Sequence, residues 1–308
     1  MWQMDTTRQS NSLCYEMTNK SVLTQYYRFF WIVLCWITFL SSAHANTTST
    51  IQTLRLGVLP DSDPQIIKQR LSPLLHYIEK QTGLNIELVI PKNYENLVEK
   101  FQNKTIDLAL FGGYTFIKAQ QKAQARAFVM RDIDLQFSTS FLTQANNPKQ
   151  NIIDFKGAIF SFGSQLSTSG HMMPRFFLDK QNIQPEVFFK EVRYSNAHDT
   201  TVYLVRDGHV DLGAVNSDVV KHMLMDKRLN KNEIRIVWKT PTYTDYVWAI
   251  QPDFDEILHD RLLDSFLSLT LQDATHQKIL ESIGARSFLP ANNADFESLR
   301  QATKIMER

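Results

Sequence analysis

The sequence predicts an α/β protein of two lobes, in which each lobe is a mostly parallel sheet flanked by helices. Strand-like and helix-like segments alternate over residues 54–123 and again over 158–217, which is typical of parallel sheets covered by helices. The stretch "LVEKFQNKTIDLALFGG" is also echoed by "TVYLVRDGHVDLGAVNS", since each contains a helix, a polar turn, an Ile-Asp or Val-Asp step and an apolar strand. Such an internal repeat indicates two lobes built alike, although generic α/β chains also produce loose echoes.

The first half of the chain supplies the first lobe. "LRLGVLP" (54–60) is a short apolar run that ends in proline, as a buried strand does, and residues 64–83 have helical apolar spacing with a glycine stop. The same reasoning predicts strands over 85–90 and 106–113 and helices over 94–105 and 114–123.

The second half repeats the alternation, with predicted strands over 158–163 and 210–217 and predicted helices over 171–181 and 199–209. Two extended stretches, 137–144 and 245–252, bound this region, and we interpret them as hinge strands that cross between the lobes. Residues 257–308 are expected to be mainly helical and to pack back on the first lobe. The expected domains are therefore lobe 1 over 46–141 and 248–308, and lobe 2 over 142–247.

The N-terminal segment has the order of a secretory signal peptide. Lys20 and Arg28 precede the apolar run "FFWIVLCWITFL" (29–40), and the small-residue sequence "SSAHA" follows it. The run is shorter than the ~20 residues that span a bilayer as a helix. We therefore expect residues 1–45 to be a signal peptide cleaved after Ala45, with Met17 as an alternative start and an uncleaved membrane anchor as the alternative interpretation.

The composition of the remaining chain narrows the compartment and the partners. Both cysteines, Cys14 and Cys35, precede the expected cleavage site, so the mature chain would have neither a disulfide nor thiol chemistry. Cleavage also leaves basic and acidic residues in equal numbers, and no global charge then draws the protein to nucleic acid or to an anionic membrane. An exported, cysteine-free protein fits a bacterial periplasm.

The loop "SQLSTSGHMMPRFFL" contains the most informative motif. Ser167, Thr168 and Ser169 stand together before Gly170, at the point where a helix is expected to begin. A helix N-terminus presents about four free N–H groups and a partial positive charge. Three hydroxyl donors and a glycine added there predict a site for a tetrahedral oxyanion. The alternative is ordinary N-capping, which needs one hydroxyl and not three.

These residues resemble a known family. "STSGHMMPRFFL" is similar to the ligand loop of the phosphate, phosphite and phosphonate substrate-binding proteins of ABC transporters, and further similar blocks are "LRLGVLP", "DFKGAIFSFGS" and "NAHDTTVYLVRDGHVDLGAVNSD". The resemblance covers nearly the whole mature chain, in order. It implies a type II periplasmic-binding fold, in which two α/β lobes joined by two crossing strands close on the ligand.

The resemblance also implies roles for individual residues. Ser167, Thr168 and Ser169 would hold phosphonate oxygens, His198 would face the same oxygens from a second helix start, and Tyr94 would close over the anion from the first lobe. Asp218 and Asp245 would hold the ammonium group of an aminoalkyl phosphonate. The further members of the predicted ligand-binding set are Gly170 and Tyr114, which follows an "FGG" turn where the family has "FGP".

Structural roles remain open for several of these residues. Tyr94 would then pack on a strand, His198 would be a surface histidine, and Asp218 and Asp245 would cap or pair locally. His171 has two possible positions, at the ligand or pointing into its lobe. Tyr243 and Tyr246 are expected near the cleft mouth, and Asp107 and Asp211 are expected to be structural turn residues.

Patterns that would indicate an enzyme are missing from the sequence. The loop is not a G-x-S-x-G elbow, no H-E-x-x-H motif occurs, and no P-loop lysine follows the glycine. We therefore predict a monomeric periplasmic binding protein, without metal or cofactor, that captures a phosphonate, phosphite or phosphate and delivers it to an ABC permease and ATPase. The alternative is a ligand sensor of the same fold that acts on a membrane kinase.

Overall fold

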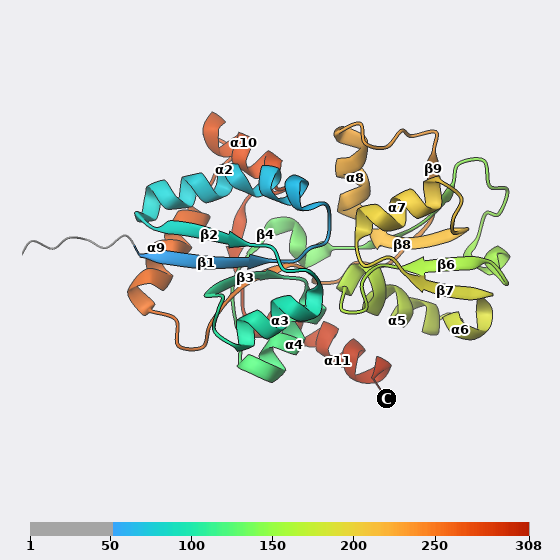
Figure 1. The fold of residues 1–308 in the computed structure, drawn as a ribbon, viewed down its shortest axis with the longest axis horizontal. Coiled ribbons are helices and arrows are strands. Elements are labelled where there is room, and N and C mark those ends of the chain that lie inside the picture. Colours follow the sequence, from blue (N-terminus) through green and yellow to red (C-terminus); the bar gives the residue numbers. More distant parts are fainter. Residues whose placement is uncertain (1–51, 308) are drawn as a thin grey trace, which may run out of the picture. The chain divides into compact units, whose positions relative to one another are not determined.

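The strands of the protein form two sheets, and the computed structural model describes residues 52–307 (Figure 1). The first sheet has six strands in the order β11-β4-β10-β3-β1-β2. Their bounds are β1 Thr53–Val58, β2 Asn85–Val89, β3 Leu108–Phe111, β4 Arg126–Arg131, β10 Val247–Ile250 and β11 Phe288–Pro290.

The second sheet has five strands in the order β7-β6-β8-β5-β9. Their bounds are β5 Thr139–Gln144, β6 Ile159–Phe162, β7 Glu191–Tyr194, β8 Leu212–Asn216 and β9 Ile234–Lys239. Each sheet and its helices are called here the first and the second lobe. Both lobes belong to the one compact unit that begins at Ile51.

Helices cover both faces of each sheet (Figure 1). On the first lobe, α2, α9 and α10 share one apolar core, while α3, α4 and α11 share another. On the second lobe, α5 and α6 lie on one face and α7 and α8 on the other. The bounds are α2 Pro64–Thr82, α3 Tyr94–Gln102, α4 Gly113–Ala123, α5 Met173–Asp179, α6 Pro185–Phe188, α7 His198–Arg206, α8 Ser217–Met225, α9 Glu256–Leu267, α10 Ala274–Ser282 and α11 Glu297–Met306.

Local sequence signals set the ends of helix α2, as predicted. The Asp63 side chain accepts hydrogen bonds from the backbone N–H groups of Gln65 and Ile66, and Pro64 occupies the first turn, where its missing N–H costs least. At the other end, Gly83 adopts a φ of 69°, a left-handed conformation that glycine accepts without strain. These signals place the helix within one residue of the range that the sequence predicted.

Most strands of each sheet run in one direction, as predicted, and the strands that cross between the lobes run in the other. β1 pairs in parallel with β2 and β3, and β6 pairs in parallel with β7 and β8. However, β10 is antiparallel to β3 and β4, and β5 is antiparallel to β8 and β9. The physical reason is that β5 and β10 enter their sheets from the other lobe, and therefore run against the strands that they separate.

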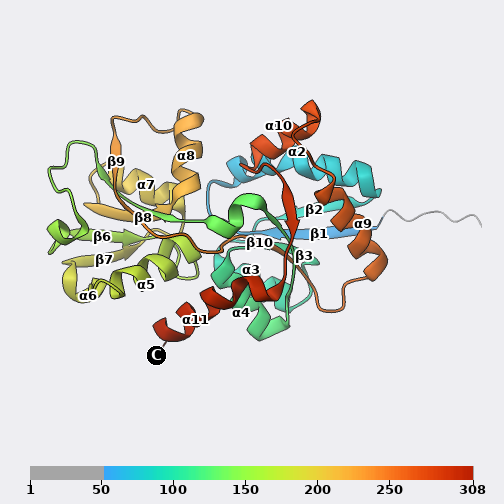
Figure 2. The ribbon, with the colours of Figure 1, turned by 180° about the vertical axis from the view of Figure 1, so that it is seen from behind.

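The two crossing segments lie beside each other between the lobes (Figure 2). Phe137 and Tyr243 form an isolated antiparallel bridge, with N···O distances of 2.8 Å and 2.9 Å. Beyond this bridge β5 lies wholly in the second sheet and β10 wholly in the first. The segments expected to be hinge strands thus cross over 137–138 and 240–246 and continue as ordinary sheet strands.

The C-terminal region packs on the first lobe, and it contributes a strand as well as helices. β11 pairs with β4 at the edge of the first sheet. The sequence did not predict β4, β7, β9 or β11. β7 and β11 are only four and three residues long, whereas β4 and β9 were missed although each has six residues, as many as β1. The expected signal peptide lies outside the described residues. Among residues 52–307, no helix is long and apolar enough to cross a membrane.

Candidate functional site

The loop after β6 folds into an unusual helix start. Residues Thr168–Met172 form a turn of π-helix, η4, which continues into α5. Ser167 is the N-cap, and its hydroxyl accepts a hydrogen bond from the N–H of Gly170 at 2.9 Å. The helical segment therefore begins three residues before the predicted start at 171, and the capping role proposed as the alternative applies to Ser167.

Pro174 explains how this loop closes on itself. Proline has no N–H, so the carbonyl of Gly170, four residues earlier, receives no helical hydrogen bond from it. The N–H of Gly163 donates to that carbonyl instead, at 2.8 Å. A Cβ at Gly170 would lie 2.9 Å from the His198 ring and 3.2 Å from the Cα of Gly163, so only glycine fits here.

Thr168 and Ser169 face the first lobe and the crossing segments. The Thr168 hydroxyl accepts the N–H of Tyr114, at the start of α4, at 3.0 Å. The Ser169 carbonyl accepts the hydroxyl of Thr139 at 2.8 Å, and that hydroxyl lies 2.6 Å from the hydroxyl of Tyr243. Thr168 and Ser169 are at most 2% exposed. Their hydroxyls therefore lie where the two lobes meet.

His198 begins α7 and lies beside the same loop. It is 1% exposed, so it is not the surface histidine of the alternative interpretation. Its Nδ1 accepts the N–H of Asn216 at 3.3 Å, and its Nε2 lies 3.4 Å from the Ser167 hydroxyl. Burial lowers the pKa of His198. The ring is therefore neutral at pH 7, with Nε2–H as a donor toward Ser167.

Asp245 lies in the crossing segment that precedes β10, and it is 1% exposed. Its Oδ1 accepts the N–H of Gly113 at 3.0 Å, while its Oδ2 has no hydrogen-bond partner within residues 52–307. Burial raises the pKa of this carboxyl to about 7, although the Gly113 bond and the hydroxyls of Thr168 and Ser169 act in the opposite direction.

The two predicted tyrosines behave differently. Tyr94, the first residue of α3, is 2% exposed. Burial and the charge of Asp61 raise the pKa of its phenol well above the ordinary value, against the effect of a hydrogen bond with Ser167. The side chain of Tyr114 instead points away, since its hydroxyl donates to Glu307. Tyr114 thus meets the loop through its backbone N–H only.

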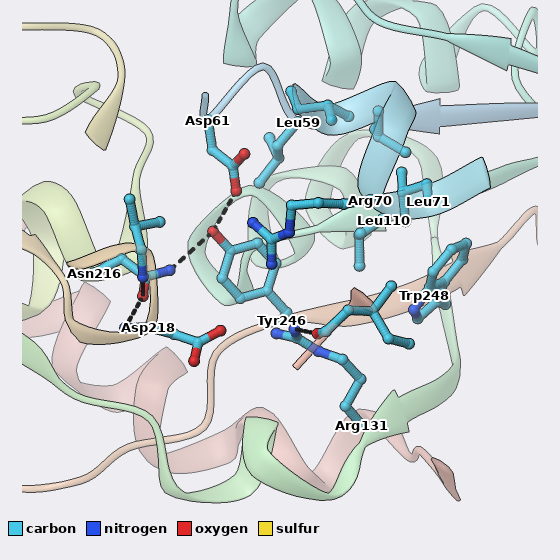
Figure 3. Close-up of a pocket in the computed structure, with 14 residues that line it drawn as sticks. Leu59, Asp61, Arg70, Leu71, Leu110, Arg131, Asn216, Asp218, Tyr246 and Trp248 are labelled. Carbon is cyan, nitrogen blue, oxygen red and sulfur yellow. Dashed lines mark hydrogen bonds between the residues drawn. The ribbon is translucent and has the colours of Figure 1, made fainter. Parts of the chain in front are cut away.

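Asp218 lies apart from this cluster, in a neighbouring cavity of about 70 Å³ (Figure 3). Its carboxylate is 3.4 Å from Nδ1 of His222. The guanidinium groups of Arg70 and Arg131 line the same cavity. The structure therefore brings Asp245 to the hydroxyl loop and places Asp218 on the other side of Tyr246.

Hydrogen bonds that the sequence did not reveal join the two lobes. Asn216 donates to the hydroxyl of Tyr246 at 3.3 Å, and this hydroxyl donates to Asp61 at 2.6 Å (Figure 3). Asp199 of α7 accepts the Ser62 hydroxyl at 2.8 Å and the Asp63 N–H at 3.0 Å. The only sequence signal for these contacts was the position of Asp61 and Ser62, which directly follow the carboxyl end of a predicted strand.

Tyr243 and Tyr246 lie deeper than expected. They are 9% and 6% exposed, and both hydroxyls are hydrogen-bonded within the site, so they line its interior and not its mouth. The site combines neutral donors, one neutral histidine and the buried carboxyl of Asp245, with the carboxylates of Asp61 and Asp199 at the contacts between the lobes. Within residues 52–307, no group of three or more histidine, cysteine, aspartate or glutamate residues could hold a metal ion. Chemically, the arrangement can hold a small oxyanion by hydrogen bonds alone.

Comparison with known proteins identifies related sequences. The family model described as "ABC transporter, phosphonate, periplasmic substrate-binding protein" matches residues 56–296. The chain is 29% identical over 272 residues to the probable ABC transporter phosphite binding protein PhnD1 of Prochlorococcus marinus (strain MIT 9301), which covers 84% of this chain and 92% of the relative. It is 22% identical over 278 residues to the phosphonates-binding periplasmic protein of Escherichia coli (strain K12), covering 88% of this chain and 81% of the relative.

A solved structure of the same Prochlorococcus protein, PhnD1 in complex with methylphosphonate, aligns with a TM-score of 0.78 at 28% identity. The alignment covers 83% of this chain and 98% of that chain. The predicted type II periplasmic-binding fold is thereby confirmed.

Proposed function

We propose that this chain, which belongs to the family of periplasmic substrate-binding proteins of phosphonate ABC transporters, captures a phosphorus oxyanion between its lobes. Family membership confirms the resemblance found in the sequence, and with it the general function of a binding protein in transport. The single observation that supports the ligand class is the convergence of Thr168, Ser169 and His198 in one buried cluster between the lobes.

The ligands named for the relatives favour a small substituent on phosphorus. PhnD1 is described as a phosphite binding protein and was solved with methylphosphonate. In this chain the hydroxyl cluster and the cavity beside Asp218 are separated by the hydrogen-bonded side chains of Asp61, Asn216 and Tyr246. We therefore propose phosphite, phosphate or a short alkyl phosphonate as the ligand. The second candidate ligand is an aminoalkyl phosphonate, whose ammonium group would bind Asp218 and Asp245. The binding measurements described below include one.

The proposed mechanism is closure of the lobes around the anion. The anion docks on the Ser167–Gly170 loop of the second lobe, where hydroxyl and N–H donors are concentrated. Tyr94 and the N–H of Tyr114 then approach from the first lobe, and their contacts with Ser167 and Thr168 form only when the lobes meet. Binding shifts the population toward the closed form by the difference in affinity between the two forms.

We further propose how the chain is processed and in what form it acts. A signal peptide over residues 1–45 is cleaved, and the mature protein is a periplasmic monomer that acts as a binding protein and not as an enzyme. Lobe 1 comprises 46–141 and 248–308, and lobe 2 comprises 142–247. The closed form is then what the permease recognises.

The Thr168→Val variant tests the ligand site. The substitution keeps the shape of the side chain but removes a hydroxyl, so an anion oxygen in a dry site loses its partner. We expect the affinity for methylphosphonate to fall about tenfold or more, measured by calorimetry on the mature protein. Phosphate, phosphite, aminoethylphosphonate and sulfate complete the screen.

Thr143→Val is the matched control. Thr143 is also fully buried, but its hydroxyl donates to the carbonyl of Asp211 inside the second lobe. The control should lower stability and leave affinity unchanged. If Thr168→Val binds every phosphorus oxyanion as tightly as the wild type, the proposed site is wrong.

A further inference from the structure

Helix α8 of the second lobe touches the first lobe outside the hydroxyl loop. His222, on this helix, is 6% exposed, and its Nδ1 lies 3.2 Å from Nη2 of Arg70, on α2 of the first lobe. The Nε–H of Arg70 also donates to the carbonyl of Ser282, at the end of α10, at 3.4 Å. The contact between His222 and Arg70 therefore joins the two lobes, and it is called here the α8 latch.

The turn between α10 and β11 is shaped to admit the His222 ring. Gly284, in this turn, has a φ of 70°, a left-handed conformation that favours glycine. A Cβ at this position would lie 2.9 Å from Cε1 of His222 and 3.2 Å from Oδ2 of Asp218. Any larger residue at 284 would therefore hold α8 away from the first lobe.

The nitrogen that contacts Arg70 has a second partner on its own helix. Asp218 precedes His222 by one turn of α8, and its Oδ2 lies 3.4 Å from Nδ1. Figure 3 shows this carboxylate in the cavity that Arg70 also lines. Arg70 can only donate, so its bond needs Nδ1 without a proton, whereas an ionised Asp218 can only accept and needs Nδ1–H. The two bonds exclude each other, and only the bond to Arg70 joins the lobes.

The charges around His222 oppose a proton on the ring when the lobes meet. Arg70 on α2 and Arg131 at the end of β4 act on it with positive charge, and Asp218 and Asp226 on α8 act with negative charge. The turn between α10 and β11 presents a glycine to the ring. Burial lowers the pKa of His222, the charge of Arg70 adds to this effect, and Asp218 acts against it. The ring is therefore neutral at pH 7, and Nδ1 is free to accept from Arg70.

We propose that the α8 latch is a pH-sensitive contact, which holds the lobes together at neutral pH and releases them in acid. A proton on Nδ1 occupies the lone pair that accepts from Arg70, and Nδ1–H then donates to Asp218 within α8. The cationic ring also repels the guanidinium that it faced. This inference rests on the proposed function, because it needs a ligand whose binding closes the lobes, and it adds a regulation of that closure.

The direction of the pH dependence follows from the surroundings of the ring. With the lobes apart, His222 would lose Arg70 and the cover of the first lobe but keep Asp218, so its pKa would return toward the ordinary value of ~6.5. Because the pKa is lower in the closed form, closure must expel a proton when the pH is below ~6.5. Ligand affinity should therefore fall about tenfold between pH 7.5 and pH 5.5 through this group, and should not change through it above pH ~7.5.

The test measures the affinity for methylphosphonate by calorimetry at pH 7.5 and pH 5.5. His222→Gln keeps an amide oxygen that can accept from Arg70 but does not titrate, so the variant should lose about tenfold less affinity in acid than the wild type. Arg70→Met keeps an apolar stem without the guanidinium. It should bind about threefold more weakly at pH 7.5 and also lose less affinity in acid than the wild type.

His76→Gln is the matched control. His76 is an exposed histidine of α2, and its Nδ1 lies 2.7 Å from the carbonyl of Ser72 in the same helix. The control should follow the wild type at both pH values. Asp245, whose pKa is raised to about 7, and the ligand itself titrate in this range. Both are common to all four proteins, so their contributions cancel in the comparison.

The outcomes separate the latch from the binding site. If His222→Gln loses as much affinity in acid as the wild type, the latch is wrong while the oxyanion site stands. If the wild type binds no phosphorus oxyanion at pH 7.5, the proposed function fails and the latch fails with it. An NMR titration of the assigned His222 ring in the wild type decides the matter even if the variants do not fold. Saturating methylphosphonate should lower the pKa of this ring, and an unchanged pKa would overturn the latch.

Discussion

Ser167, Thr168 and Ser169 are neighbours in the sequence, yet each makes a different contact. Ser167 caps its own helix, Thr168 accepts an N–H from the first lobe, and Ser169 lies beside Asp245 and Tyr243. The sequence predicted a block of donors at a helix start. It could not distinguish the three, because each role is set by a partner far away in the chain.

His171, at the end of the same motif, has a structural role. Its ring packs edge-on against Phe162 and Tyr194, so it points into its own lobe. Nδ1 lies 2.7 Å from the Gln165 carbonyl, and Nε2 accepts the Nε–H of Arg175 at 3.0 Å. Nδ1–H can donate to the Gln165 carbonyl in either protonation state, but Nε2 can accept from Arg175 only in the neutral ring.

Acid should therefore weaken the second lobe through His171. Burial lowers its pKa to about 4, so the folded state binds the proton less tightly than the unfolded chain, whose histidine has a pKa of ~6.5. Stability from this group is complete above pH 6.5 and is lost as pH falls toward 4, by about 2 kcal/mol at pH 5. Urea unfolding at pH 7 and at pH 5 would measure this loss of stability.

His171→Gln is the matched variant for that measurement, because an amide can keep both hydrogen bonds without titrating. The variant should lose less stability between pH 7 and pH 5 than the wild type, by about 1–2 kcal/mol. If both proteins lost the same stability between pH 7 and pH 5, the pH dependence would not come from His171.

At the scale of elements, the repeated Ile-Asp and Val-Asp steps have one structural role. Asp211 accepts the backbone N–H of Ile159, at the start of β6, at 2.7 Å. Asp107 accepts the backbone N–H of Arg55, in β1, at 2.8 Å. Each carboxylate thus ties the turn before a strand to the neighbouring parallel strand. The expectation that these aspartates are structural turn residues is confirmed.

Removing this tie should cost stability without affecting the site. Asp211→Ala leaves the Ile159 N–H without its acceptor and should lower the free energy of unfolding by about 1 kcal/mol. Asp107→Ala should cost more, about 2 kcal/mol, because Arg55 also donates two side-chain bonds to Asp107. Urea unfolding and calorimetry with methylphosphonate would check both variants. Equal stability of Asp211→Ala and the wild type would contradict this role.

For the whole molecule, closure depends on contacts that need not touch the ligand. Asp199, from the second lobe, accepts two hydrogen bonds from the segment between β1 and α2 of the first lobe. These bonds form only when the lobes meet. In the proposed mechanism ligand binding is linked to closure, so these bonds would contribute to affinity from a distance.

Asp199→Ala should therefore weaken ligand binding although Asp199 is not a proposed ligand contact. Loss of both interlobe bonds should reduce the affinity for methylphosphonate about tenfold, mainly by faster release. Ser62→Ala removes only one of the two bonds and should reduce affinity about threefold. Stopped-flow measurements of ligand release would test whether Asp199→Ala has the larger effect of the two variants. If both variants release ligand at the wild-type rate, these contacts do not hold the closed form together.

The sequence alone determined the alternation of strands and helices, the two-lobed plan, and the block of hydroxyl residues at a helix start, Ser167–Gly170. These features are local: helix caps, apolar periodicity and turn residues act over a few positions in the chain. His198 and Asp245 lie in the same buried cluster as this loop, and they were singled out in the sequence only through the family resemblance.

Only the tertiary structure decided which of these groups meet. It separated Asp218 from Asp245, turned the Tyr114 side chain toward Glu307, and recruited Asp61, Asn216 and Asp199 to join the lobes. The physical reason is that these contacts bring together residues far apart in the chain, either from different lobes or, for Tyr114 and Glu307, from two distant parts of the first lobe. Their geometry depends on how the two sheets pack across the crossing segments, which no local pattern in the chain encodes.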